Sequence, residues 1–374
     1  MIKIALDSRM INNSGIGTYL RNMIPVLLEE FQLTLLGNIN ELMDYSNLES
    51  LKILKCDSSI YSIKEQFELY SKIPKCDVFI SPHYNIPILP IKAKRRIAII
   101  HDVYHLAFYK SLGLKQKLYA KFMINSAINK SDKIITVSEF SRSEIIKYAS
   151  CDPQKLMVIY CGLDDKNFRK NLSVDYAQKI KQRYNLPEKF FLFVSNIKPH
   201  KNLKNLLLAF KLFLKNNYDY KLVVVGKKEG LITQDPEVFE IVEKNEQLNQ
   251  NVIFTGYISN DEIVSFYKHA AALVFPSFYE GFGLPPLEAM ICNCPVISST
   301  AASLPEACGD AALYFEPRDP VKIAEQMQKL ISNKGLRDQL IKRGTENYKK
   351  FNKENFSKNL SKIITEVAEK EIRI

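Results

Sequence analysis

The sequence predicts an α/β protein of two domains, each with a parallel sheet covered by helices on both faces. Short apolar runs alternate along the chain with longer amphipathic segments, the pattern of repeated strand–helix units. The chain has 374 residues, of which 46% are hydrophobic, enough for two cores of ordinary size. Composition shifts after the strand expected at 156–160. We therefore expect domains at 1–168 and 169–354, followed by a closing helix at 355–374.

Charge and cysteine content narrow the class of protein. The formal net charge of +11 favours anionic partners, but no zinc-finger spacing, basic zipper or RNA-recognition motif is present, so nucleic acid is not expected. The seven cysteines are scattered and read as reduced, buried thiols without a zinc site. No apolar run approaches the length of a membrane span, and Asp7 comes too early for a signal peptide. We expect a cytoplasmic protein.

The first half opens with a strand at Lys3–Asp7, a loop, and a helix expected from Thr18. Gly15 and Gly17 lie in that loop, as in phosphate-cradling turns, although a third glycine is missing and a simple turn is an equal alternative. Tyr19 falls on the apolar face of the helix. Further strands are expected at Leu33–Gly37, Leu51–Leu54, Val78–Ser81, Ile97–His101, Lys133–Val137 and Leu156–Tyr160.

Polar and aromatic residues follow two of these strands. His83 and Tyr84 come after one strand, and His101 and Asp102 end the next. Loops at the carboxyl ends of parallel strands converge, so we expect these side chains to line one crevice with the glycine loop. A lone histidine is more often a core or capping group, but an apolar strand leads directly into His101. Asp102 is expected to orient its ring.

A basic amphipathic helix is expected at 112–131. The segment contains no acid, and leucines and aromatic residues alternate with four lysines: Lys115, Lys117, Lys121 and Lys130. Such a helix can lie on an anionic membrane. The alternative is an ordinary domain helix with lysines on its solvated face.

The second half begins with a strand at Phe190–Val194, a loop, and an amphipathic helix from Asn202. Lys198, His200 and Lys201 therefore stand at the amino end of a helix, where the helix dipole already attracts anions. Basic groups oppose the dipole there, which favours an external anion over a merely exposed cluster. More strands are expected at Lys221–Val225 and Asn251–Thr255.

The stretch Leu273–Ser299 organises the second domain. A buried strand breaks at Pro276 into a loop with Glu280 and the turn Gly281-Phe282-Gly283, and Pro285-Pro286 suits the first turn of a helix that carries Glu288. Backbone N–H groups from Gly281 to Leu284 can hold an anion. Carboxylates beside such an anion site are suited to sugar hydroxyls.

This stretch resembles the paired-glutamate signature of retaining glycosyltransferases of family 4. Asn196–Lys201, Gly15–Tyr19 and His101-Asp102 resemble the same family, and the likeness covers nearly the whole chain. It implies the GT-B fold: two Rossmann-like α/β domains facing across a cleft, with the C-terminal helix crossing back to the N-terminal domain. The N-terminal domain would take the acceptor, and the C-terminal domain the nucleotide sugar.

The resemblance implies transfer of a hexose from a nucleotide-diphosphate sugar to a glycan hydroxyl with retention. Bacterial mannosyltransferases of surface polysaccharide (O-antigen or capsule) synthesis look most similar, so GDP-mannose is the first expected donor. Rhamnose, glucose, galactose and N-acetyl sugars stay open. The expected acceptor is a lipid-linked glycan at the inner face of the cytoplasmic membrane. A nucleotide-sugar epimerase and a non-catalytic nucleotide-sugar-binding subunit are the alternatives.

The resemblance also implies residue roles. Glu280, His101 and Lys201 are the expected catalytic residues. Lys201 would hold the donor diphosphate, and Asn196 stands where the family has an arginine that Lys198 or His200 can replace. The resemblance implies further contacts with the pyrophosphate, base, sugar and ribose of the donor. The residues expected to make them are Gly15, Gly17, Ile258, Glu280, Gly281, Phe282, Gly283, Leu284 and Glu288. On the acceptor side, Tyr19, His83, Tyr84 and Asp102 are expected. No DxD-type triplet is suitably placed, so neither metal nor cofactor is expected.

Overall fold

The structure is a computed structural model of the chain. It describes residues 1–45, 51–108, 113–163, 165–169, 173–216, 219–227 and 235–370. The chain divides into two compact units. The first comprises Met1–Leu163 with Phe351–Ile374, and the second Asp164–Lys350.

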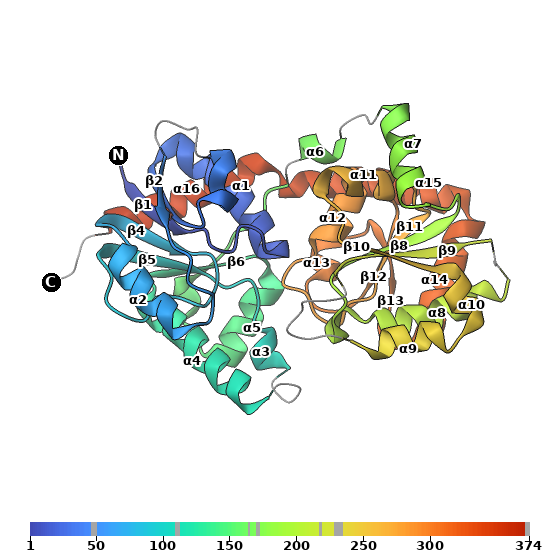
Figure 1. Cartoon of the computed structure of the whole chain (residues 1–374), viewed down its shortest axis with the longest axis horizontal. Coiled ribbons are helices and arrows are strands. Elements are labelled where there is room, and N and C mark those ends of the chain that lie inside the picture. Colours follow the sequence, from blue (N-terminus) through green and yellow to red (C-terminus); the bar gives the residue numbers. More distant parts are fainter. Residues whose placement is uncertain are drawn as a thin grey trace. The chain divides into compact units, whose positions relative to one another are not determined.

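The first unit alternates strands and helices as the sequence predicts (Figure 1). Its strands are β1 (Lys3–Asp7), β2 (Gln32–Gly37), β3 (Lys52–Lys55), β4 (Cys76–Ser81), β5 (Ala93–Ile99), β6 (Lys133–Thr136) and β7 (Leu156–Val158). Its helices are α1 (Ser14–Glu30), α2 (Ile63–Lys72), α3 (Tyr104–Ala107), α4 (Leu114–Lys130), α5 (Glu139–Ala149) and α16 (Lys353–Glu369). Single 3-10 turns lie at Asn40–Tyr45 and Pro153–Lys155.

The seven strands form one parallel sheet in the order β3-β2-β1-β4-β5-β6-β7. The order reverses between β1 and β4, and loops at the carboxyl ends of strands at such a switch point form a ligand crevice in α/β folds. Ile4, Leu6, Val78 and Ile80 are at most 1% exposed. Burial on both faces explains why these strands read as continuous apolar runs.

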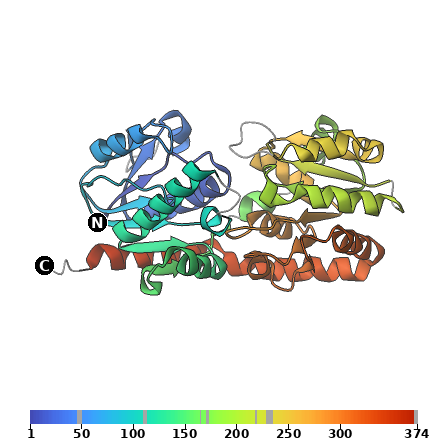
Figure 2. The same cartoon turned by 90° about the horizontal axis from the view of Figure 1, so that it is seen from below.

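The last helix packs within the first unit, as expected of the closing helix. Helix α16 contacts α1, β4 and β5, and Figure 2 shows it in red along the elements of this unit. The Phe356 ring meets the Tyr19 ring edge-on at 5.3 Å. A Cβ on Gly162 would lie 2.7 Å from the Phe356 side chain, so the glycine permits this packing.

The second unit is a separate strand–helix series. Its strands are β8 (Phe190–Val194), β9 (Lys221–Val225), β10 (Val252–Gly256), β11 (Ala272–Phe275), β12 (Val296–Ser299) and β13 (Ala312–Phe315). Its helices are α6 (Asp165–Arg169), α7 (Val174–Arg183), α8 (Leu203–Leu214), α9 (Glu237–Glu243), α10 (Glu246–Asn251), α11 (Asn260–His269), α12 (Leu284–Ile291), α13 (Leu304–Cys308), α14 (Pro320–Ser332) and α15 (Lys334–Asn347). Single 3-10 turns lie at Pro199–Lys201 and Tyr348–Phe351.

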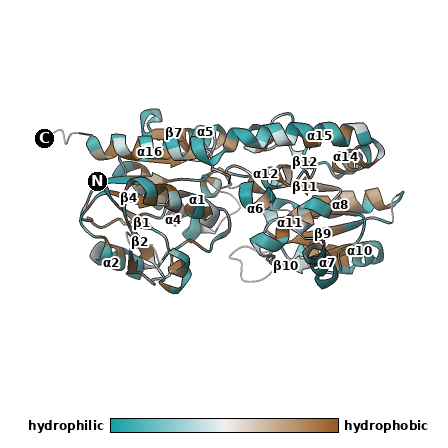
Figure 3. Ribbon diagram, turned by 90° about the horizontal axis from the view of Figure 1, so that it is seen from above, coloured by the Kyte–Doolittle hydropathy of each residue, from teal (hydrophilic) through white to brown (hydrophobic). Residues whose placement is uncertain are grey.

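These six strands form a second parallel sheet in the order β10-β9-β8-β11-β12-β13. The order reverses between β8 and β11, the two strands that lead into the lysine loop and the Glu280 loop. Helix α8 covers the sheet with Leu206, Leu207 and Phe210, all 0% exposed. Figure 3 shows the strands largely in the hydrophobic colour, whereas the helices carry hydrophilic residues as well.

The structure corrects two boundaries. The first unit ends at Leu163 rather than 168, and it resumes at Phe351 rather than 355. Leu163 N–H donates to the Phe351 carbonyl at 2.9 Å, so the residues at which the chain leaves and re-enters the first unit are hydrogen-bonded to each other. Helix α1 begins at Ser14 instead of Thr18, which places the glycines inside its first turn. All seven cysteines are buried and unbridged.

Candidate functional site

The loop after β8 is built to present Lys201. Pro199–Lys201 form a 3-10 turn, and Asn202 then adopts a left-handed backbone with φ of 60° before α8 begins. Asparagine tolerates this region because its short side chain bonds locally. Its Nδ2 donates to the carbonyls of Pro276 (2.9 Å) and Pro317 (2.7 Å), which ties this loop to the one after β11. The sequence marked Asn202 only as the start of this helix and did not predict that its side chain joins two loops.

Lys201 and Glu280 meet at the switch point of the second sheet. Lys201 Nζ donates to both carboxylate oxygens of Glu280, at 2.7 and 2.8 Å. The two side chains are 17% and 12% exposed, so water screens the pair only partly. The structure thus brings two residues into contact for which the resemblance implied different roles. Lys201 was expected to hold the donor diphosphate, and Glu280 was expected to contact the sugar.

The glycine turn holds the Glu280 loop in place. Gly283 has φ of 109°, and an added Cβ would lie 2.8 Å from Leu304 Cδ2, so a side chain is doubly disfavoured. Ser303 Oγ donates to the carbonyls of Glu280 (3.0 Å) and Phe282 (2.8 Å). Ser303 was also missed, because nothing in the sequence pairs it with a loop some twenty residues earlier. Gly281 and Phe282 precede α12, and Leu284 begins it.

Glu288 lies one turn into α12 and is held by a buried tyrosine. Tyr267 Oη, on α11, donates to Glu288 Oε2 at 2.9 Å. Burial, and then the neighbouring carboxylate, raise the pKa of Tyr267 well above its ordinary value. The phenol therefore stays protonated and orients the partly exposed carboxylate. The sequence did not mark Tyr267 as a site residue.

Other donor-side expectations fall around β8, β9 and β10. Asn196, Lys198 and His200 are all partly exposed in the loop after β8, and the His200 carbonyl accepts from Phe278 N–H at 2.8 Å. Gly226 fixes this loop, since an added Cβ would lie 1.8 Å from the Ser195 carbonyl oxygen. Ile258, expected to contact the base, is 5% exposed as a whole residue.

In the first unit, Gly15 and Gly17 differ in the space that is available for a side chain. An added Cβ on Gly17 would lie 2.2 Å from the Ile11 carbonyl oxygen, so packing alone requires glycine there. A Cβ on Gly15 would meet nothing within 4 Å. Glycine lowers helix stability, so the chain's own packing gives no reason for Gly15.

His101 is held neutral at the end of β5. Its Nε2 lies 3.0 Å from the Pro82 carbonyl oxygen, which only accepts, so Nε2 carries the proton and Nδ1 is an acceptor. Burial lowers the pKa of His101, although Asp102 and the Pro82 carbonyl act in the opposite direction. Asp102 was expected to orient the ring, and this is wrong: its Oδ1 accepts from Tyr104 N–H at 2.9 Å instead.

The acceptor-side residues divide by burial. Tyr19 is 1% exposed, and its ring meets His101 edge-on at 5.3 Å, so it supports that histidine from the core and does not face an acceptor. Tyr84 is 4% exposed and lies under His83 with ring centroids 3.8 Å apart. His83 is partly exposed, and burial followed by the neighbouring histidines lowers its pKa well below the ordinary value.

The basic segment forms α4, and of the expected range 112–131 Leu112 lies outside the described residues. Met123 and Ile124 face the core, whereas large apolar side chains remain 71%, 59% and 56% exposed, namely Leu114, Leu118 and Phe122. Lys115 and Lys121 are exposed beside them. No helix in the described ranges is both long and apolar enough to cross a membrane.

Comparison with known proteins agrees with this geometry. Residues 14–167 match the family model described as "Glycosyltransferase Family 4", and residues 176–347 match "Glycosyl transferases group 1". O-antigen chain mannosyltransferase B of Escherichia coli is 28% identical over 269 residues, which cover 71% of this chain and 69% of that one.

Solved structures share the architecture. Sucrose-phosphate synthase of Thermosynechococcus elongatus has a TM-score of 0.76 at 17% identity, covering 98% of this chain and 99% of that one. HepE of Anabaena, in complex with UDP-glucose, has a TM-score of 0.76 at 15% identity, covering 98% and 100%. At these identities the likeness concerns the fold, which is GT-B. The chain belongs to glycosyltransferase family 4.

Proposed function

We propose that this glycosyltransferase moves a hexose, in the first place mannose from GDP-mannose, to a hydroxyl of a lipid-linked glycan. The reaction proceeds with retention and without a metal, in the synthesis of a bacterial surface polysaccharide. The observation that carries the proposal is the Lys201–Glu280 pair at the switch point of a parallel sheet. The E. coli mannosyltransferase supports mannose, and HepE with UDP-glucose supports a nucleotide-diphosphate sugar as donor class.

Lys201 is assigned to the donor diphosphate. A lysine ammonium has three N–H donors, and two of them are directed at Glu280. The third then donates to a phosphate oxygen while the pair stays intact. As the glycosidic bond breaks, negative charge grows on the departing diphosphate, and a preorganised cation at that position stabilises the transition state. Gly15 provides space for the pyrophosphate, and Lys198 or His200 the second phosphate contact.

The two glutamates act on different parts of the donor. Glu280 binds hydroxyls of the transferred sugar and stabilises its cationic character, with Lys201 and Ser303 fixing its side chain and backbone. Glu288 accepts from the ribose hydroxyls, with Tyr267 fixing one of its oxygens. His101, neutral and accepting at Nδ1, contacts the sugar or a hydroxyl of the acceptor.

Retention follows from front-face displacement in this proposal. The bond from the anomeric carbon to the diphosphate oxygen breaks, and the acceptor oxygen bonds to the same face. The departing phosphate oxygen takes the acceptor proton, so no covalent glycosyl-enzyme forms. Among the described residues, no three His, Cys, Asp or Glu side chains are grouped to hold a metal, and Lys201 supplies the charge that a metal would otherwise supply.

A lipid-linked acceptor lies in a membrane, and α4 has a surface suited to attach the protein there. The exposed apolar side chains Leu114, Leu118 and Phe122 recur every four residues beside lysines, so one face of the helix suits the boundary between headgroups and acyl chains of an anionic membrane. We infer peripheral attachment at the inner face of the cytoplasmic membrane.

A donor screen tests the proposal. The thermal midpoint is measured with GDP, UDP, dTDP and ADP and their common sugar conjugates, with and without a chelator, and transfer is followed by the anomeric configuration of the product. We expect a specific upward shift with GDP and GDP-mannose that chelation does not change. Absence of a shift with every diphosphate would refute donor binding, and an inverted product or a trapped glycosyl-enzyme would refute the mechanism.

A further inference from the structure

Tyr61 has an unusual backbone in the turn that precedes α2. Its φ is 69°, in the left-handed region, and it is the one aromatic residue with such a backbone in the described ranges. Bulky residues avoid this region because their Cβ crowds the backbone, and such residues cluster at functional sites. The side chain is nevertheless 42% exposed, so core packing does not explain its position.

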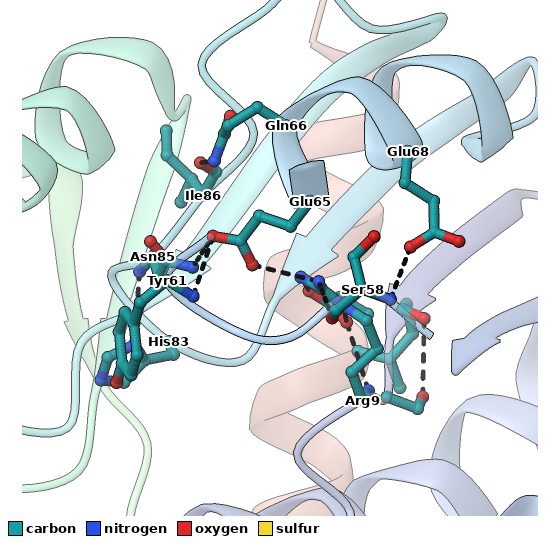
Figure 4. A network of polar contacts seen from close by, with 12 residues as sticks. Arg9, Ser58, Tyr61, Glu65, Gln66, Glu68, His83, Asn85 and Ile86 are labelled. Atoms are coloured by element: carbon teal, nitrogen blue, oxygen red, sulfur yellow. Dashed lines mark hydrogen bonds and ion pairs between the residues drawn. The ribbon is translucent and has the colours of Figure 1, made fainter. Parts of the chain in front are cut away.

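A buried ionic network holds this turn (Figure 4). Tyr61 N–H donates to Glu65 Oε1 at 3.2 Å, and Asn85 Nδ2 donates to the same oxygen at 2.6 Å. The other oxygen, Oε2, pairs with Arg9 Nη1 at 3.0 Å, and Arg9 is held by both oxygens of Asp7. The Glu65 side chain is 0% exposed. The network therefore joins segments that follow β1, β3 and β4, on both sides of the switch point of the first sheet.

The same network positions two rings beside the Tyr61 ring. The Tyr61 ring meets His83 at 6.0 Å and Tyr119 at 5.8 Å between ring centroids, both nearly edge-on. Asn85 fixes these two neighbours: its N–H donates to His83 Nδ1 at 3.3 Å, and its Oδ1 accepts from Tyr119 Oη. Because Nδ1 of His83 accepts, the neutral ring carries its proton on Nε2.

The chemistry of this group fits a neutral sugar. Asp7, Arg9 and Glu65 are paired with one another, and their side chains are at most 5% exposed, so their charge is not offered to a ligand. What remains accessible is Tyr61, which is 42% exposed, with His83 and Tyr119 partly exposed beside it. Aromatic rings stack on the apolar C–H face of a pyranose, and hydroxyls and imidazole bind its edge.

We propose that Tyr61 is the sugar-stacking residue of the acceptor glycan subsite, flanked by His83 and Tyr119, and that Glu65 is the residue that positions its turn. This inference rests on the proposed function, since it assigns the acceptor half of that reaction to the loop ends of the first sheet. It adds two residues, Tyr61 and Tyr119, that the sequence did not mark.

The test separates the ring from the backbone. In Tyr61→Gly the left-handed backbone is no longer strained while the ring is lost, so the protein should be at least as stable as wild type. We measure saturation-transfer NMR and titrations with methyl α-mannoside, methyl α-glucoside and methyl α-galactoside as probes. Wild type should bind at least one of them, and Tyr61→Gly about tenfold more weakly. Tyr61→Phe should retain binding.

Ser150→Gly is the matched control, because Ser150 also has a left-handed backbone in the first unit, with φ of 49°. It should change neither binding nor fold. Glu65→Gln should weaken binding as well, but no further in the Tyr61→Gly background, because Glu65 acts through the turn.

Hexoside binding by Tyr61→Gly equal to that of wild type would overturn the inference, as would a wild type that binds none of the three probes. Donor binding is read separately, from the thermal shift with GDP, and depends on Lys201 in the second unit. Loss of that shift in wild type would contradict the proposed function, whereas loss of hexoside binding alone would contradict only the acceptor subsite.

Discussion

Lys201 donates to both carboxylate oxygens of Glu280, and the two residues follow the strands at which the order of the second sheet reverses. The ion pair has two consequences. It holds the Glu280 carboxylate in one orientation, and it keeps a cation beside that carboxylate, where we propose that the donor diphosphate binds. A mutation of either partner therefore changes the charge of the site as well as one contact.

Replacing Lys201 by alanine should abolish donor binding. The substitution removes the cation and leaves Glu280 without its partner, at 12% exposure, which repels a diphosphate. We expect kcat/KM for transfer to fall by at least about a hundredfold, and the thermal shift with GDP to disappear. Lys204→Ala is the control, because Lys204 lies on α8 and pairs with Glu237, but both side chains are about half exposed or more. Equal activities of the two variants would contradict the role of Lys201.

Gly15→Ala should raise stability and lower activity at the same time. Nothing in the chain lies within 4 Å of the added methyl group, and alanine favours the first turn of α1 by up to about 1 kcal/mol. If the pyrophosphate approaches this backbone, the methyl group obstructs it and the KM for the donor rises. Gly335→Ala is matched, since Gly335 is likewise the second residue of a helix, α15. That control should gain stability without loss of activity, and an unchanged KM in Gly15→Ala would remove Gly15 from the donor site.

The sequence predicted the strands and the loops at their carboxyl ends, because a parallel sheet buried on both faces leaves continuous apolar runs. It therefore placed Lys201, Glu280 and Glu288 on the correct elements. It did not predict that Lys201 binds Glu280, since a contact across 79 positions depends on strand order, which no local pattern encodes.

Two expectations were wrong, each for a different reason. Asp102 follows His101 directly, but the ring is held by the carbonyl of Pro82, 19 residues away, and Asp102 instead accepts from Tyr104 N–H. The start of α1 was placed too late because glycine disfavours helices, whereas packing against Ile11 tolerates no larger residue at Gly17.

Tyr267→Phe should weaken donor binding with little effect on the fold. The phenol donates to Glu288 Oε2, and its removal lets the carboxylate rotate while water replaces the lost bond at the partly exposed end. We expect the KM for the donor to rise about three- to tenfold at similar kcat, from a loss of about 1 kcal/mol. Tyr184→Phe removes the same kind of bond, to Glu262 Oε2 at 3.1 Å, and should leave the KM unchanged. A KM change shared by both variants would indicate a general effect on the unit.

Stability should fall in mild acid because of His83 and His101. Burial lowers the pKa of both imidazoles in the folded protein below 6.5, so the unfolded chain takes up their protons first as the pH falls. Their contribution is complete above pH 6.5 and is lost below it, by up to about 1.4 kcal/mol per pH unit for each histidine. Urea unfolding between about pH 7.5 and 5 measures the slope. His83→Phe should make the dependence of the unfolding free energy on pH less steep, because one proton fewer is taken up on unfolding. An unchanged slope would show that His83 titrates normally.

Leu118→Asp should release the protein from anionic membranes. Leu118 is 59% exposed at the centre of the apolar face of α4, so the substitution removes no core contact and should leave the fold intact. It places a negative charge against anionic headgroups, beside Lys115 and Lys121, which attract the protein by about 1 kcal/mol each near such a surface. Co-sedimentation with vesicles of phosphatidylglycerol and phosphatidylethanolamine measures the bound fraction.

The control for this membrane test is Leu208→Asp on α8, a leucine that is 37% exposed in the second unit and should not alter binding. Wild type should bind vesicles that contain phosphatidylglycerol, with binding decreasing as salt is raised, and should not bind neutral ones. If Leu118→Asp and wild type sediment equally, α4 is not the attachment surface, and its lysines are then the solvated face of an ordinary domain helix.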